Sequence, residues 1–392
     1  MKETNNTPKE IRELLDNAIT LDAMVEHIKE MYKNNLNIFL WGDPGIGKTE
    51  SVVQFVKEKQ KDNPKFGYVY FPLASMEPAD LIGIPTTRLV KDGNGVEQMR
   101  TFWATPSNLP TEKDWEGILF FDEYNNAPAA MQNALQQLVQ ERRLGNYHLP
   151  DGARIIAAGN LSGQNAYSTE LQAPVKDRFA HQCVKTNAEL WTHYILNKYA
   201  SAKNQLQTAM SDVVGFVCAH PDLLFDTAGM ESGSYTFATP RSWERIIKLY
   251  GNADKPTETS LFHFFAQYIG SANSHLLLEF IANKKKYQNA NEILVDGKNF
   301  RDDKDINGFY STFISIMSIL NSTVADTEDK ASEKKVSEYM KNLMKAVHNM
   351  KRADWKTTVV STIAKSTSLF KYLSITDIQA VAKSIKGVNN RQ

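Results

Sequence analysis

Residues 37–49 read NIFLWGDPGIGKT. The first five residues form an apolar run typical of a short buried strand, and the last eight match the phosphate-binding pattern GxxxxGK[ST] in full. The residues that follow, ESVVQFVKEKQK, have the apolar spacing of a helix. A strand, a glycine-rich loop and a helix, in this order, are the local structure that a P-loop requires. The stretch therefore predicts a site for the phosphates of a nucleotide.

Each residue type in this loop has a physical role in holding phosphate. Gly42, Gly45 and Gly47 let the backbone curl so that its N–H groups face the phosphates. Lys48 supplies positive charge to the β- and γ-phosphates, and Thr49 offers its hydroxyl to Mg²⁺. The following helix adds the positive end of its dipole. The predicted cofactors are ATP and Mg²⁺, and the predicted cofactor-binding residues are Gly42, Asp43, Pro44, Gly45, Ile46, Gly47, Lys48, Thr49 and Glu50.

Three more apolar strands are expected beside the first. They are YVYFPLA at 68–74, GILFF at 117–121 and ARIIAAGN at 153–160, and a helical pattern follows the second of them. Strands that alternate with helices indicate a parallel sheet covered on both faces. TTRLV, the turn KDGNG and VEQMRTFW predict a hairpin inserted at about 86–103. The expected fold is therefore an α/β P-loop domain.

Polar side chains stand where two of these strands end. ILFFDE, at 118–123, ends in two acids, of which Asp122 is expected to hold Mg²⁺, through water, and Glu123 to orient and activate the attacking water. Asn160 ends the strand RIIAAGN and can position that water or touch the γ-phosphate. The plainer interpretation is solvated acids and an ordinary strand-ending amide, which their place downstream of the P-loop disfavours. Glu123, Asn160 and Lys48 are the predicted catalytic residues of this part of the chain.

Two arginines complete the set of candidate catalytic residues. Arg178, in VKDRF, either pairs locally or acts as an arginine finger, which stabilises the transition-state charge in a neighbouring subunit's site. Arg241, in ATPRSWERI, is either a surface residue or a second contact to the γ-phosphate. It stands at a predicted helix start, with Thr239 as the cap and Pro240 in the first turn.

The length and the residue patterns predict three domains. A chain of 392 residues is too long for one ordinary domain. Strand patterns stop after about residue 187. We therefore expect an αβα nucleotide-binding domain at 1–187, a small helical lid domain at 188–252 and an all-helical domain of unassigned role at 253–392.

Composition limits the classes of partner and compartment. Lys plus Arg and Asp plus Glu are both 45, so the formal net charge is zero and nothing attracts the whole chain to nucleic acid or anionic membranes. Cys183 and Cys218 have no metal-ligand spacing around them and are expected to be reduced core thiols. No signal-peptide pattern and no apolar run near the roughly 20 residues that span a bilayer is present. We therefore expect a cytoplasmic protein with no membrane partner.

At this point the chain resembles the AAA+ ATPases over roughly residues 15–250. SMEPADLIGIP at 75–85, with the hairpin after it, is similar to the interrupted helix of the MoxR-like branch. NNAPAAMQNALQQLVQERRLG at 125–145 resembles the NRAPPxxQxALLxxMxExxV stretch of that branch. The shared motifs, in family order, are the Walker A loop GDPGIGKT, the Walker B strand FFDE, Asn160, DRF with Arg178, and TPR with Arg241.

The resemblance implies a hexameric ring with ATP at the subunit interfaces. It implies hydrolysis of ATP and water to ADP and phosphate, coupled to chaperone-like remodelling or assembly of a protein partner, often one with a von Willebrand factor A-type domain. It gives Lys48, Thr49, Asp122, Glu123, Asn160, Arg178 and Arg241 the roles described above. In the branch with the interrupted helix the lid is displaced in some members, so whether Arg241 acts on its own or the neighbour's nucleotide stays open. Residues 253–392 match no family motif.

Three functions compete at this level. The leading one is an ATP-driven remodelling factor acting on protein, with hairpin residues that face either the partner or the ring body: Leu89, Val90, Val96 and Met99. The alternative is a nucleic-acid motor or loader of the helicase or restriction type. It draws on the basic residues Arg88, Lys91 and Arg100, against which stand Asp92, Glu97 and the zero net charge. A scaffold whose ATPase only locks assembly is the third.

Overall fold

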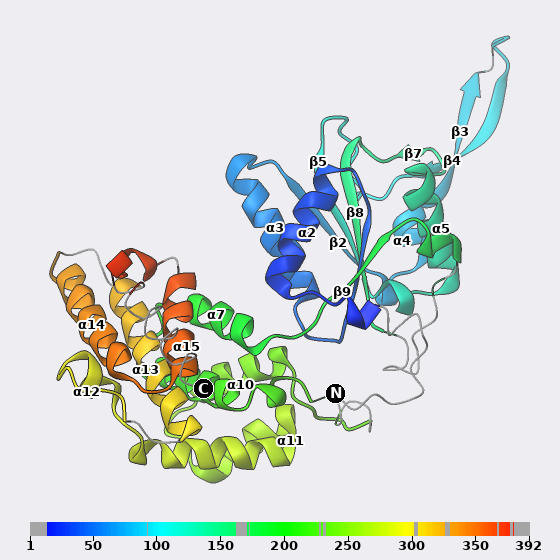
Figure 1. Cartoon of the computed structure of the whole chain (residues 1–392). Coiled ribbons are helices and arrows are strands. Elements are labelled where there is room, and N and C mark those ends of the chain that lie inside the picture. Colours follow the sequence, from blue (N-terminus) through cyan, green and yellow to red (C-terminus); the bar gives the residue numbers. More distant parts are fainter. Residues whose placement is uncertain are drawn as a thin grey trace. The chain divides into compact units, whose positions relative to one another are not determined.

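The computed structural model describes residues 14–91, 93–161, 171, 173–226, 229, 233–301, 305–325, 330–366, 368–376 and 379. The chain divides into two compact units, Met1–Lys185 and Thr186–Gln392. The first holds every described strand and the second is helical (Figure 1). Each unit is described by itself.

The first unit is built on a five-stranded parallel sheet of order β2-β5-β8-β1-β9. Its strands are β1 (Ile38–Trp41), β2 (Gly67–Pro72), β5 (Glu116–Asp122), β8 (Gly152–Gly159) and β9 (Ala180–Cys183). The first four confirm the predicted strands. The edge strand β9 was not predicted, because AHQC has neither an apolar run nor alternation, and only pairing with β1 defines it. The predicted α/β fold is confirmed.

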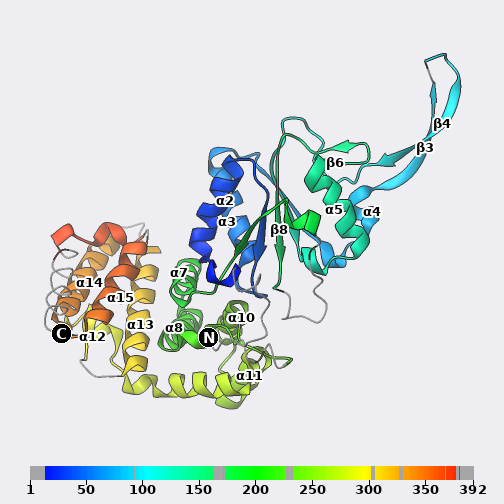
Figure 2. The same ribbon diagram turned by 45° about the vertical axis from the view of Figure 1, so that its right-hand side comes forward.

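Helices cover both faces of this sheet, α2 and α3 on one side and α4 and α5 on the other in both views (Figures 1 and 2). They span α2 (Leu21–Lys33), α3 (Lys48–Asp62), α4 (Pro78–Ile82) and α5 (Ala129–Glu141), and a short α6 (Ala173–Lys176) precedes β9. Alternate strand residues such as Leu119 and Phe121 share a buried cluster with Leu135 and Leu138 of α5. This alternation is the expected result of burying a parallel sheet on both faces.

A long hairpin follows α4 and projects from this unit (Figures 1 and 2). Its strands β3 (Ile84–Lys91) and β4 (Glu97–Ala104) pair antiparallel, which confirms the hairpin predicted at 86–103. Gly83 closes its base at φ +90°, and a Cβ there would lie 1.9 Å from the carbonyl oxygen of Ala104, so the position requires glycine. Asp92 lies outside the described residues. A second, very short hairpin joins β6 (Arg143–Leu144) to β7 (Tyr147–His148).

The second unit is a set of helices around one hydrophobic core. The core runs from Trp191 to Leu369 and includes the fully buried Trp243. The subdivision of this region at residue 252 stays a prediction. No described helix is long and apolar enough to cross a bilayer. The helices are α7 (Ala188–Lys198), α8 (Asn204–Ala219), α10 (Pro240–Asn252), α11 (Glu258–Asn283), α12 (Ala290–Leu294), α13 (Ile306–Ala325), α14 (Lys330–Asn349) and α15 (Ala353–Lys365).

Candidate nucleotide-binding site

The glycine-rich loop connects β1 to α3 at the carboxyl edge of the sheet. Gly45 and Gly47 have φ of 77° and 110°, in the left-handed region that favours glycine. Gly47 is also the N-cap of α3, so Lys48 and Thr49 begin the helix whose positive end faces the loop. The backbone therefore has the conformation and the helix terminus that phosphate binding requires.

Lys48 is the buried cation of this loop, with 8% of its surface exposed. Its Nζ donates to the carbonyl oxygens of Gly42 at 2.6 Å and Asp43 at 3.0 Å. It also donates to Oδ1 of Asn160 at 3.0 Å. A buried ammonium needs such acceptors to offset its lost hydration. The P-loop and the end of β8 are thus joined through Lys48 and Asn160.

Thr49 and Asp122 meet at the expected place for a metal ion. Thr49 Oγ1 donates to Asp122 Oδ2 at 3.0 Å, which brings the loop against the end of β5. Tyr70, on the neighbouring strand β2, donates its hydroxyl to the same oxygen at 3.2 Å. A hydroxyl beside a carboxylate is the hard oxygen donor set that Mg²⁺ takes in nucleotide sites, where phosphates and water complete its shell. The residues present therefore fit Mg²⁺.

Glu123 follows directly at the end of β5. Its side chain is exposed, and its backbone has a left-handed φ of 56°. Its N–H donates to Oδ1 of Asp122 at 2.9 Å. A non-glycine residue at positive φ is uncommon and needs support from its surroundings. This turn leaves the carboxylate of Glu123 exposed, while the carboxylate of Asp122 accepts the hydrogen bond from Thr49.

Asn160 is joined to a residue that the sequence analysis did not single out. Asn125 Nδ2 donates to the carbonyl oxygen of Asn160 at 2.8 Å, and the Asn160 N–H donates to Asn125 Oδ1 at 3.2 Å. In the sequence, Asn125 belongs to a family-like stretch and Tyr70 to an apolar strand, and nothing else distinguishes them. An alternation argument could have placed Tyr70 on the face of β2 opposite Phe71, but no local pattern reveals the pairing of Asn125 with Asn160.

The two arginines stand in different units. Arg178 lies between α6 and β9, half-buried, with its N–H donating to the carbonyl oxygen of Val175 at 3.2 Å. Arg241 is exposed in the first turn of α10, where Thr239 Oγ1 accepts the N–H of Ser242 at 3.0 Å. The predicted cap at Thr239 is confirmed. The roles of both arginines toward ATP stay predictions.

An aromatic cluster supports the strand end beneath the loop. Trp41 Nε1 donates to His181 Nδ1 at 2.9 Å, and His181 Nε2 lies 2.8 Å from the carbonyl oxygen of Lys176. Because the first nitrogen accepts, the second must carry the proton, so the ring is neutral. Burial lowers the pKa of His181; the hydrogen bond to the Lys176 carbonyl oxygen opposes this, and the Lys176 charge adds to it. The same cluster includes Phe39, which stacks on Trp41.

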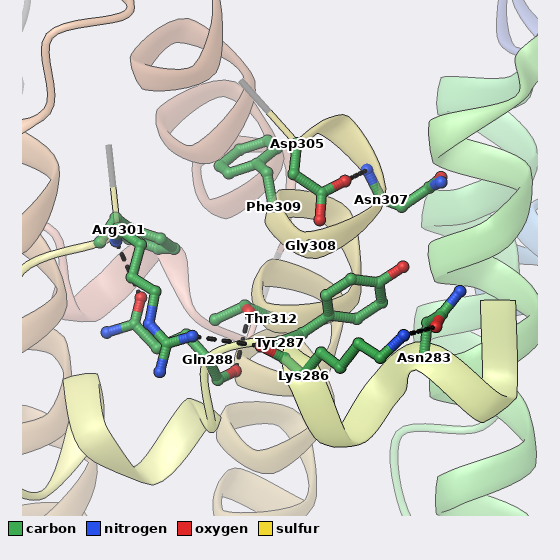
Figure 3. A pocket seen from close by; sticks show the side chains of 11 residues that line it. Asn283, Lys286, Tyr287, Gln288, Arg301, Asp305, Asn307, Gly308, Phe309 and Thr312 are labelled. Atoms are coloured by element: carbon green, nitrogen blue, oxygen red, sulfur yellow. Dashed lines mark hydrogen bonds between the residues drawn. The ribbon is translucent and has the colours of Figure 1, made fainter. Parts of the chain in front are cut away.

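A pocket of about 360 Å³ lies in the helical unit, and its lining includes none of the predicted site residues (Figure 3). Its polar groups bond to one another. Lys286 Nζ donates to Asn283 Oδ1 at 2.8 Å, and Thr312 Oγ1 donates to the carbonyl oxygen of Gln288 at 2.8 Å. The Arg301 N–H donates to Gln288 Oε1 at 2.9 Å. These bonds join the segment between α11 and α12 to Arg301 and to α13, and the pocket adds nothing to the nucleotide site.

Comparisons with known proteins agree with this geometry. Residues 37–179 match the model of the AAA domain, dynein-related subfamily. No curated protein matches the chain. A solved structure assigned as an ATPase of Cytophaga hutchinsonii is 16% identical over 70% of this chain and 84% of that chain, with a TM-score of 0.32.

Two RuvB mutants from Thermotoga maritima are also similar. One is 14% identical over 71% of this chain and 70% of its own, and the other is 12% identical over 93% and 90%, each with a TM-score of 0.31. TM-scores this low do not assign a function to this chain. The assignment rests on the family model, whose match begins just before β1 and ends at Phe179, and which therefore contains the loop and both strand ends. The chain therefore contains an AAA+ ATPase domain.

Proposed function

We propose that this protein is a MoxR-type AAA+ ATPase that hydrolyses ATP in a hexameric ring and uses the energy to remodel or assemble a protein partner in the cytoplasm. The observation that carries the ATPase proposal is the meeting of three segments. Lys48 reaches Asn160, and Thr49 reaches Asp122. A loop for phosphates, a carboxylate for the metal and an exposed acid beside it are what phosphoryl transfer to water requires.

The residues then have distinct tasks. Lys48 and the loop N–H groups bind the β- and γ-phosphates, and Thr49 and Asp122 would hold Mg²⁺, which neutralises the charge that develops on the phosphate oxygens. Glu123 orients the attacking water and takes its proton. Asn160 positions the same water or the γ-phosphate. None of these tasks needs a cluster of protein ligands around a metal, and the described residues contain no such cluster.

Hydrolysis in this proposal needs a second subunit. Arg178 lies beside α6 and reaches the ATP of a neighbour, whose transition state it stabilises. Arg241, exposed at the start of α10, contacts the γ-phosphate of its own or of the neighbouring subunit. The nucleotide thus lies at a subunit interface, which couples hydrolysis in one subunit to the position of the next.

The hairpin β3–β4 supports a protein as the partner. Leu89 and Met99 stand directly opposite each other, and their exposed fractions are 63% and 64%. Trp103 stands on the same face, four residue pairs nearer the base, with 43% exposed. Exposed apolar side chains gathered on one face of a projecting element are typical of protein contact sites. We propose that this face contacts the partner, and a von Willebrand factor A-type domain is the partner class the family resemblance suggests.

The opposite face favours the alternative, a motor acting on nucleic acid. Arg88 and Arg100 form a directly opposed pair, and neither guanidinium makes a side-chain hydrogen bond or ion pair with another described residue. Like charges directly opposite each other destabilise a hairpin, so such a pair fits phosphate contact. Against this stands the zero net charge of the chain. Two arginines supply a small electrostatic term, and nucleic acid is the less favoured partner.

The experiment uses Glu123→Gln protein, which is expected to bind ATP with Mg²⁺ and to assemble but not to hydrolyse. The wild type is expected to release phosphate from ATP, and normal hydrolysis by Glu123→Gln would show that the base is misassigned. Proteins retained by the ATP-bound variant are then identified, with ADP-bound protein as the control.

Paired hairpin variants separate the two partner classes. Leu89→Ser with Met99→Ser is expected to abolish retention of the partner, whereas Arg88→Ala with Arg100→Ala leaves it intact. Stimulation of ATPase by single- or double-stranded DNA, lost in the arginine pair and weakened by salt, would instead establish the nucleic-acid motor.

A further inference from the structure

Asn125 is a buried residue whose side-chain amide bonds the backbone of Asn160 through both of its polar atoms. It is 1% exposed and lies in the turn directly after Glu123. Its Nδ2 donates to the Asn160 carbonyl oxygen at 2.8 Å and its Oδ1 accepts the Asn160 N–H at 3.2 Å. The amide therefore bonds residue 160 as a paired strand would, at the point where β8 ends and sheet pairing stops.

The chain makes room for this contact at Gly159. A Cβ at that position would lie 2.6 Å from Asn125 Oδ1, closer than carbon and oxygen approach. Any other residue would push the amide away from the strand end or force the strand to shift. Gly159 and Asn125 are thus matched to each other, although 33 residues of chain lie between them.

The contact fixes the side chain that touches the P-loop. The Asn160 N–H and carbonyl oxygen are both hydrogen-bonded to Asn125, which restricts the backbone there, and Asn160 Oδ1 lies 3.0 Å from Lys48 Nζ. Asn125 also belongs to the same short turn as Glu123, whose carbonyl oxygen accepts the N–H of Asn126 at 2.9 Å. The Asn125 amide therefore connects the turn after Glu123 to Asn160, the residue that accepts a hydrogen bond from Lys48.

We propose that Asn125 is a positioning residue for hydrolysis, which sets the Asn160 amide against the γ-phosphate and the water that Glu123 activates. The proposal rests on the ATPase function proposed above. Asn125 itself touches neither ATP nor water and acts through Asn160. Preorganised polar groups lose much of their effect when they shift by about 1 Å, so loss of Asn125 lowers kcat rather than ATP affinity.

A merely structural role predicts something different. If Asn125 only satisfied two buried backbone groups, its loss would lower the stability of the fold. It would then lower kcat by the same factor in the wild-type and in the Asn160→Ala protein. A double-mutant cycle with Asn160 separates the two roles, because residues that act through one another are not additive. The matched control is Asn126→Ala, because Asn126 is the next residue in the turn and its Oδ1 has no partner among the described residues.

The experiment measures kcat and KM for ATP, with Mg²⁺, in the full chain for Asn125→Ala, Asn160→Ala, both together and Asn126→Ala. We expect Asn125→Ala to lower kcat by about 10- to 100-fold with KM within about 3-fold, and the double variant to match Asn160→Ala within about 2-fold. Asn126→Ala keeps wild-type kcat.

Wild-type kcat in Asn125→Ala, or losses that multiply in the double variant, overturns the proposal. If Asn125→Ala fails to fold, Asn125→Asp keeps the size and the acceptor but removes the donor. It is expected to fold, to lose at least about 5-fold in kcat and to add no loss to Asn160→Ala, and any other result in the cycle again overturns the proposal. A wild type that does not hydrolyse ATP refutes the proposed function instead, so the two failures are distinguishable.

Discussion

Thr49 Oγ1 lies 3.0 Å from Asp122 Oδ2, and this bond joins two residues that are 73 positions apart. Thr49 begins the helix after the glycine-rich loop, and Asp122 ends the strand β5. The strand between them in the sheet order is β8, because β5 and β1 are not neighbours. Side chains at the carboxyl ends of these parallel strands can meet because the crossovers bring the loop over that edge.

The first prediction concerns binding of the nucleotide. Lys48→Ala removes the buried cation of the loop, and we expect ATP affinity to fall at least about 10-fold because a charge-assisted contact to phosphate is lost. Titration with a fluorescent ATP analogue measures the effect. Lys57→Ala, an exposed lysine on the same helix, is the control and keeps wild-type affinity. Equal affinities for the two variants would contradict the phosphate role of Lys48.

The second prediction concerns the proposed arginine finger. Arg178→Ala is expected to keep ATP binding within a few-fold and to lose about 10³-fold in kcat, because a transition-state contact alone is removed. Arg143→Ala, at the exposed short hairpin, is the control. Mixing Arg178→Ala with Glu123→Gln subunits should restore some activity, because one interface in the mixed ring then has both groups. Activity that never returns on mixing would argue for action within one subunit.

The third prediction concerns a buried ion pair in the helical unit. Asp212 is 2% exposed and is bonded by Lys284 and by the hydroxyl of Tyr250. Burial raises the pKa of Asp212, while the Lys284 charge opposes that rise. Lys284→Met leaves a buried carboxylate without its cation and should cost about 2–3 kcal/mol, less than the ~3–5 kcal/mol of a fully buried pair because Lys284 is partly exposed.

Urea unfolding measures this change, with Lys285→Met as the matched control because Lys285 is the next residue and is exposed. In the Lys284→Met variant the folded state favours protonated Asp212 still more strongly. The loss of unfolding free energy relative to the wild type should therefore shrink as the pH falls toward about 4, where the carboxyl of the unfolded chain also takes up a proton. A deficit that does not change with pH would mean that lost packing, not charge, causes it.

The fourth prediction concerns pH. Burial lowers the pKa of His181, so the folded state binds its proton less readily than the unfolded chain does. The stabilisation is complete above about pH 6.5 and is lost as the pH falls below that value. We expect the Tm of the wild type to drop more between pH 7.5 and 5.5 than that of His181→Gln, which cannot titrate.

The histidine His193 in the other unit is the comparison for this effect. Burial, with the Lys365 charge adding to it, also lowers the pKa of His193. His193→Gln should therefore protect the helical unit, and His181→Gln the sheet unit, against acid. Hydrogen exchange in each unit distinguishes them, and the prediction is refuted if neither substitution changes the pH dependence.

Local patterns in the sequence were enough for the loop, four strands and the hairpin. Each of these elements has either a characteristic pattern of apolar residues or glycine where the backbone must turn. Both signals can be recognised without knowing which distant segments the element contacts. Lys48, Thr49 and Asp122 could be named for the same reason. Their chemistry is encoded in motifs whose spacing is set within one strand and one turn.

Tertiary structure alone decided the rest. The strand β9 exists because Ala180–Cys183 pairs with β1, and Asn125 reaches Asn160 because β5 and β8 lie side by side. Hydrogen bonds between segments far apart in the chain leave no periodic trace in either segment. The sequence by itself therefore determined which groups could bind phosphate and metal. The order of the strands decided that the buried amide of Asn125 meets the backbone of Asn160 beside them.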